Sequence, residues 1–80
     1  MSRVAVLYFA SLRDAAHLAN EAVETQAADL AALYAELQAR HGFTLARESL
    51  RVAVDGAFAR WEDALSADSE VAFIPPVSGG

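Results

Sequence analysis

The fold is decided by the stretch Val71-Ala72-Phe73-Ile74-Pro75-Pro76-Val77-Ser78-Gly79-Gly80, with which the sequence ends. Its first four residues are apolar and partly β-branched, which predicts a strand. Pro75 and Pro76 stop that strand, because neither has a backbone N–H for a sheet ladder and each fixes its own φ. Small residues follow, so we predict a domain over residues 1–76 and a flexible tail over residues 77–80.

Two interpretations of this tail are open from the residues alone. Prolines followed by small residues occur at frayed termini and in linkers of truncated chains, where they have no function. Alternatively, the terminal carboxylate of Gly80 is the active group and becomes an electrophile after activation by another protein. Glycine suits a lead that enters another protein's active site, because it has no Cβ to clash. Pro75 and Pro76 would hold that lead extended, close to polyproline II geometry.

Composition narrows the classes of protein to which the chain can belong. It has 80 residues, 55% of them hydrophobic, which suffices for one small domain. There is no cysteine, and two histidines are too few for a metal cluster, so no metal site is expected. The net charge of −5 argues against nucleic-acid binding and favours a basic protein partner. The apolar run at residues 4–10 is too short to cross a membrane, and we expect a cytoplasmic protein.

Apolar periodicity predicts five strands, at residues 3–9, 21–26, 51–54, 57–60 or 57–61, and 71–74. Asp55-Gly56 favours a type I′ hairpin between the third and fourth strands. A short helical turn capped by Ser11 is expected to run to Ala16. In the second strand, we expect Ala22 to point inward together with Val23 or Thr25, and both glutamates to point outward (Glu21 and Glu24).

The helix at residues 29–40 is the clearest element of the sequence. Asp29 suits its N-cap, and Gly42 lies where a left-handed C-cap belongs. Phe43 is then expected to fold back onto an apolar stripe with the spacing i, i+3, i+4 and i+7, formed by Leu30, Leu33, Tyr34 and Leu37.

These elements predict an α+β fold in which a mixed five-stranded sheet carries the one main helix on one face. The first and last strands are apolar on both sides, so we expect them to be neighbours in the sheet centre. If Val71 and Phe73 face the helix, the opposite face collects Leu7, Phe9, Phe58, Ala72 and Ile74. An apolar patch at the root of the tail usually marks a partner site, although loops covering it are the simpler alternative.

The side chains give no sign of a self-sufficient enzyme. Carboxylates are paired at Glu62-Asp63 and at Asp68 with Glu70, but in a turn-rich segment where a solvated loop is the simpler interpretation. The serines have no histidine or lysine base arranged around them, and no glycine-rich phosphate loop follows a strand. His41 is expected at the C-terminus of the helix, where the helix dipole favours a protonated imidazole.

The sequence resembles the MoaD family, the small subunits of molybdopterin synthase, over its whole length. The most specific part is the Phe-x-Pro-Pro-x-x-Gly-Gly ending at residues 73–80. Residues 7–13 resemble that family's strand followed by Phe-Ala-x-x-Arg, and residues 52–56 stand where it has a hairpin. The segment Asp-Ser-Glu-Val at residues 68–71, which leads into the last strand, resembles the segment Gly-Asp-Glu-Val that the family has at the same place.

This resemblance implies a β-grasp, ubiquitin-like fold and a role as a sulfur carrier. Gly80 would be adenylated by a MoeB-like E1 enzyme that uses ATP and magnesium, and then converted to a thiocarboxylate. The tail would insert into a MoaE-like large subunit within a heterotetramer and deliver sulfur to cyclic pyranopterin monophosphate. The catalytic residues would lie on that large subunit, and this chain would bind no cofactor itself.

The resemblance also implies roles for individual residues. The threading tail would comprise Pro75, Pro76, Val77, Ser78 and Gly79, and the partner interface would comprise Phe9, Arg13, Phe58 and Ile74. Many family members carry an aromatic residue where this chain has Ile74, which keeps an apolar contact without a ring.

Three alternatives share the fold or the tail. Sulfur carriers for thiamine thiazole, cysteine or tRNA thiolation also end in Gly-Gly, but less often with the preceding Pro-Pro. A ubiquitin-like modifier would use the same activated carboxylate to acylate lysines on target proteins. A plain interaction domain with an inert tail is the third alternative.

Overall fold

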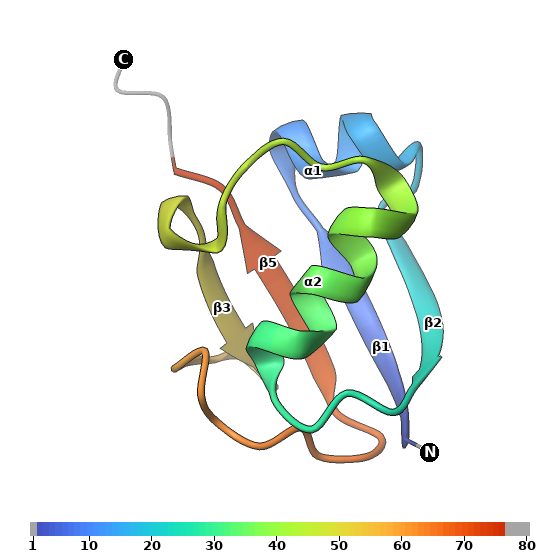
Figure 1. Ribbon diagram of the computed structural model, residues 1–80, viewed down its shortest axis with the longest axis vertical. Coiled ribbons are helices and arrows are strands. Elements are labelled where there is room, and N and C mark those ends of the chain that lie inside the picture. The colour runs from blue at the N-terminus through green and yellow to red at the C-terminus, as the bar shows by residue number, and fades with distance from the viewer. Residues whose placement is uncertain (1, 77–80) are drawn as a thin grey trace.

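The computed structural model describes residues 2–76. A five-stranded mixed sheet in the order β2-β1-β5-β3-β4 carries helix α2 across one face (Figure 1). The strands are β1 (Ser2–Tyr8), β2 (Asn20–Thr25), β3 (Arg51–Val54), β4 (Ala57–Ala59) and β5 (Glu70–Ile74). The helices are α1 (Ala10–Ala16), α2 (Leu30–His41) and the short 3₁₀ turn η1 (Arg47–Ser49). This is the β-grasp architecture predicted from the sequence, with a second, shorter helix in α1.

The two strands that are apolar on both sides lie next to each other, as predicted. β1 and β5 pair in parallel, with Val6 opposite Val71 and Tyr8 opposite Phe73. β2 pairs antiparallel with β1, and β3 pairs antiparallel with β5. The last strand therefore lies in the interior of the sheet, and the chain leaves it at Pro75.

Helix α2 forms and ends as its sequence predicts. The Asp29 side chain accepts a hydrogen bond from the backbone N–H of Ala32, 2.8 Å away, and so caps the first turn. Gly42 closes the helix in the left-handed region, with φ of 72°, and its N–H donates to the Gln38 carbonyl. The predicted apolar stripe is fully buried against the sheet, and Phe43 stacks on Tyr34.

The core lies between α2 and the sheet and is rich in aromatic rings. Tyr8, Tyr34 and Phe73 are each at most 1% exposed. The indole of Trp61 stacks on Phe73 with ring centroids 5.9 Å apart, although Trp61 lies outside β4. β4 thus ends at Ala59, before the predicted boundary at residue 60 or 61.

Two local predictions are wrong. The residue that caps α1 is Phe9, which keeps an extended backbone and makes no side-chain cap, and Ser11 lies inside the helix. In β2 the buried face carries Val23 and Thr25, while Ala22 is exposed. Because side chains alternate along a strand, Glu21 shares the buried face with Val23, and the prediction that it points outward is wrong.

Candidate functional site

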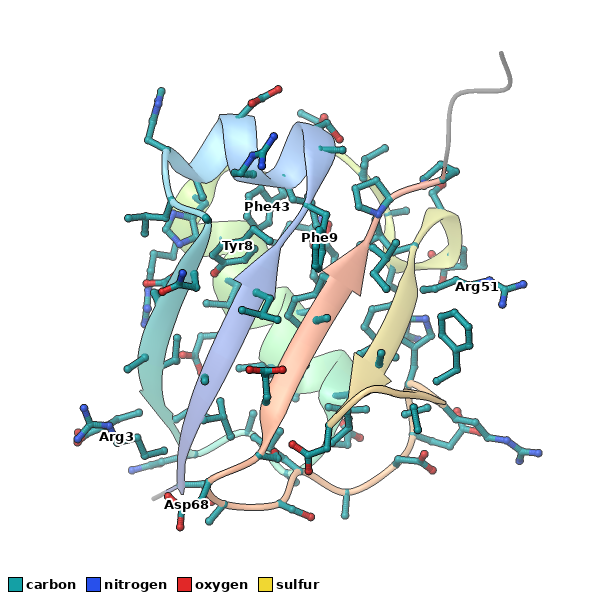
Figure 2. All side chains as sticks on the ribbon, turned by 180° about the vertical axis from the view of Figure 1, so that it is seen from behind. Arg3, Tyr8, Phe9, Phe43, Arg51 and Asp68 are labelled. Carbon is teal, nitrogen blue, oxygen red and sulfur yellow. The ribbon has the colours of Figure 1, made fainter. Side chains whose placement is uncertain are left out.

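The face of the sheet opposite α2 carries exposed apolar side chains (Figure 2). Phe9 is 43% exposed and Phe58 is 67% exposed, which is unusual for large hydrophobic residues. Ala72 and Ile74 are partly exposed because they alternate along β5 with the fully buried Val71 and Phe73. The predicted assignment of the two faces of β1 and β5 is therefore confirmed. We call this surface the open face.

The open face is hollowed near its centre. A depression of about 280 Å³ runs across β1, β5, β3 and β4. Ala53 and Ala72 are paired across β3 and β5, and because their side chains are small they leave space above the sheet, which is the depression. The depression is lined by Leu7, Phe9, Ala53, Gly56, Phe58, Glu70, Ala72 and Ile74. Three of the predicted interface residues, Phe9, Phe58 and Ile74, thus meet at one hollow.

A second hollow lies at the point where the chain leaves the sheet. It has a volume of about 470 Å³ and includes Ile74, Pro75 and Pro76 in its wall. The guanidinium of Arg51 lies over the Phe58 ring, 5.1 Å from its centroid, a distance at which the cation and the ring attract each other. Phe58 and Ile74 line both hollows. The apolar surface is therefore continuous from the centre of the open face to the root of the tail.

The fourth predicted interface residue lies elsewhere. Arg13 is an exposed residue of α1 and lines neither of the two hollows. Pro75 is buried and Pro76 is exposed. The remaining predicted site residues, Val77, Ser78, Gly79 and Gly80, lie outside the described residues.

One of the paired carboxylates has a clear local structural role. Asp63 accepts a hydrogen bond from the backbone N–H of Arg60, whereas Asp68 is held through its backbone N–H, which donates to the Arg3 carbonyl. Among residues 2–76, no three histidine, cysteine or acidic side chains cluster in a way that would hold a metal ion. That same part of the chain contains no helix long and apolar enough to span a membrane.

One polar cluster was not predicted. On the helix side of the sheet, Glu21 of β2 accepts a hydrogen bond from the Tyr8 hydroxyl, and its Oε2 lies 2.7 Å from His41 Nε2. Arg40 approaches the other carboxylate oxygen at 3.8 Å. Burial alone would raise the pKa of Glu21, but hydrogen bonds from Tyr8 and His41 and the nearby positive charge lower it. Burial and the Glu21 carboxylate raise the pKa of Tyr8 far above its usual value.

This cluster connects β1, β2 and the end of α2, and lies on the covered side of the sheet. The sequence signal that could have revealed it is the period-2 pattern of Val23 and Thr25, which places Glu21 inward. Its position indicates a structural role, and the open face is the better candidate for function.

Comparison with solved structures supports the fold over nearly the whole chain. SAMP1 from Haloferax volcanii is 25% identical with a TM-score of 0.83, covering 99% of this chain and 100% of that one. A Pyrococcus furiosus protein assigned as molybdopterin converting factor, subunit 1, is 28% identical with a TM-score of 0.81, covering 96% and 100%.

A third structure contains a complex of two proteins. It is the complex of subunits 1 and 2 of the molybdopterin-converting factor from Helicobacter pylori, whose matching chain shares the fold at 24% identity and a TM-score of 0.67. The match covers 98% of this chain and 99% of that one. No curated protein sequence matches the chain significantly.

The family assignment comes from the sequence model of the ThiS family, which matches residues 6–80. That range begins within β1 and includes the other four strands, the open face and the Gly-Gly ending. The chain therefore belongs to the ThiS family, and it is a sulfur carrier with a ubiquitin-like fold.

Proposed function

We propose that the chain is the sulfur-carrying small subunit of molybdopterin synthase. The observation that carries this proposal is the apolar open face, which is continuous with the root of a Pro-Pro-x-x-Gly-Gly tail. The whole-length sequence resemblance to the MoaD family and the similarity to the Pyrococcus furiosus protein support the same pathway.

In this proposal Gly80 is the site of chemistry and the domain positions it. A MoeB-like enzyme with ATP and magnesium would adenylate the Gly80 carboxylate, which makes its carbonyl carbon electrophilic. Attack by a sulfur donor would displace AMP and leave a thiocarboxylate. Val77, Ser78 and Gly79 would then lead this group into the active site of a MoaE-like large subunit, where it transfers sulfur to cyclic pyranopterin monophosphate.

The division of labour follows from the described side chains. The polar cluster at Glu21 is used in packing, and the open face offers mainly apolar contact, with Glu70 as the one charged residue that lines its central hollow. The catalytic and pterin-binding residues therefore belong to the large subunit in this proposal. Phe9, Phe58 and Ile74 would bind that subunit, and Arg13 would contact it from α1, outside the two hollows.

Reconstitution tests this proposal. The chain is loaded by the activating enzyme and mixed with the large subunit and cyclic pyranopterin monophosphate, and molybdopterin is measured. We expect product with the native terminus and none with a variant extended by one alanine after Gly80. Product formation by the extended variant, with its terminus intact by mass, would exclude Gly80 as the donor site.

The similarity to a small archaeal modifier protein favours one second candidate, a protein modifier. The same activated Gly80 would then acylate amines on other proteins. Because all six basic residues of this chain are arginines, its own side chains offer no lysine acceptor. Higher-mass conjugates on other proteins, in place of a thiocarboxylate, would identify this activity.

A further inference from the structure

Glu70 is the one charged residue among those that line the central hollow of the open face. It lies on β5 opposite Ala5 of β1, and its side chain shares the exposed side of the strand with Ala72 and Ile74. A single carboxylate at the end of an apolar depression is chemically distinct from the scattered surface acids of the loops.

The hairpin turn fixes the backbone of Glu70 and brings a second carboxylate, that of Asp55, close to this strand. The backbone N–H of Glu70 donates to Asp55 Oδ1 at 2.9 Å, and the Asp55 N–H donates to the Glu70 carbonyl at 2.8 Å. Asp55 belongs to the tight turn between β3 and β4 and has a φ of 51°. The end of the hollow farthest from Pro75 therefore carries concentrated negative charge on a rigid strand.

The described part of this chain provides no cation for Glu70. The ion pairs within residues 2–76 join arginines and His41 to other carboxylates. Arg3 contributes to a shallow depression beside Glu70, but Figure 2 shows its side chain directed toward the β2 edge, away from β5. Within residues 2–76, the Glu70 carboxylate therefore has no ion-pair partner.

A partner that covers the hollow must remove that water. An ionised carboxylate that loses its hydration without a counter-ion opposes binding strongly, whereas a partner cation offsets the loss and gives directional contact. We infer that the partner protein places an arginine or lysine side chain against Glu70 when its apolar surface fills the hollow. Because Glu70 and Ile74 stand at opposite ends of β5 in this hollow, and Ile74 leads into Pro75, this ion pair would orient the partner relative to the point where the chain leaves the sheet.

The inference rests on the proposed function in taking the MoaE-like large subunit as that partner. The test compares the affinity of the purified large subunit for the native chain, for Glu70→Gln and for Glu62→Gln. Gln keeps the shape of Glu and removes its charge. Glu62 is the matched control, because its side chain is 72% exposed in a loop and its one ion pair within residues 2–76, with Arg60, is long at 3.9 Å.

We expect Glu70→Gln to weaken binding by about 10-fold or more at low ionic strength, and Glu62→Gln to change it by less than about 2-fold. The gap between the two variants should largely persist in about 0.5 M salt, because an ion pair covered by the partner is screened much less than exposed charges. Equal or tighter binding of Glu70→Gln would overturn the inference. If the partner offers no cation, removing the carboxylate makes it easier for the partner to cover the hollow, so binding would not weaken.

The two proposals fail in different ways. If the native chain does not bind the large subunit, the molybdopterin assignment and this inference fall together. If the native chain binds but Glu70→Gln binds equally well, only the ion pair is wrong. Equal unfolding midpoints for the native chain and both variants would show that the differences in affinity come from the interface and not from a loss of folding.

Discussion

Glu21 shows how one buried carboxylate can connect three elements. It accepts hydrogen bonds from Tyr8 of β1 and His41 of α2 while it lies at the start of β2. Its side chain is only 18% exposed, so these bonds replace most of its contact with water. Removing the charge of Glu21 leaves the Tyr8 hydroxyl and the His41 imidazole with a weaker acceptor. This lowers the stability of the fold, because little water reaches the site to replace the lost interaction.

We predict that Glu21→Gln lowers the free energy of unfolding by about 1–3 kcal/mol at neutral pH. Glu24→Gln, on the exposed face of the same strand, should change it by less than about 0.5 kcal/mol. Urea denaturation followed by circular dichroism measures both. Equal stability of the two variants would mean that the Glu21 cluster does not stabilise the fold.

The same carboxylate predicts a pH dependence of stability. The pKa of Glu21 is lower in the folded protein than in the unfolded chain, so its contribution is complete above the unfolded pKa, about 4.3. That contribution is lost as the pH falls through the folded pKa. The native chain should therefore lose stability more steeply than Glu21→Gln below about pH 4 in denaturation curves. Parallel pH profiles would contradict this linkage.

At the scale of elements, strand alternation separates core from surface within a few residues. On β5, Phe73 packs against Trp61 and Tyr34, while Ile74 faces the open hollow. On the edge strand β4, Phe58 is 67% exposed. Core contacts and the proposed partner contacts are therefore made by neighbouring residues with opposite orientation.

We predict that Phe58→Asp leaves the unfolding midpoint nearly unchanged but greatly weakens binding to the large subunit. Phe73→Ala is the contrasting variant and should cost about 3–5 kcal/mol of stability, because Phe73 is completely buried. Thermal unfolding and titration calorimetry measure the two effects. Loss of the fold in Phe58→Asp would mean that the open face belongs to the core.

The helix gives a prediction of its own. Asp29→Ala removes the side-chain acceptor for the Ala32 N–H and should destabilise the protein by about 1 kcal/mol. Asp29→Asn is the control and should be nearly neutral, since an asparagine side chain caps equally well. Chemical denaturation compares the two variants, and equal loss in both would point to the charge rather than the cap.

The sequence predicts those elements whose residues contain their own signal. Helix α2 has its cap residues and its apolar stripe in one segment, and β5 is bounded by Pro75. The inward position of Glu21 follows from its alternation with Val23 and Thr25, but the cluster that it forms could not be predicted in the same way, because its partners Tyr8 and His41 are distant in sequence and approach it only in the folded sheet. Ser11 resembles a cap, but the N-cap of α1 lies two residues earlier, at Phe9.

The open face was likewise predictable only in part. Phe9, Phe58 and Ile74 follow from the resemblance to the MoaD family and from strand alternation. The hollow between them depends on the pairing of Ala53 with Ala72 across β3 and β5, which a linear pattern does not contain. The position of Glu70 at its end depends on that same register.

At the scale of the whole molecule, the domain is a rigid base whose open face lies beside the exit of the tail. The core is on the α2 side, so a partner can cover the open face without disturbing it. In the proposed function, docking and delivery of the terminus are coupled, because the strand that contributes Glu70, Ala72 and Ile74 to the open face runs directly into Pro75 and Pro76.

The central claim is that Gly80 carries sulfur as a thiocarboxylate. The most direct measurement is the intact mass of the chain after incubation with a MoeB-like enzyme, ATP, magnesium and a sulfur donor. Exchange of one oxygen for sulfur predicts a gain of about 16 Da, confined by fragmentation to Gly80 and absent from a chain extended past Gly80. An unchanged mass with an active enzyme, or the same gain in the extended chain, would contradict the claim.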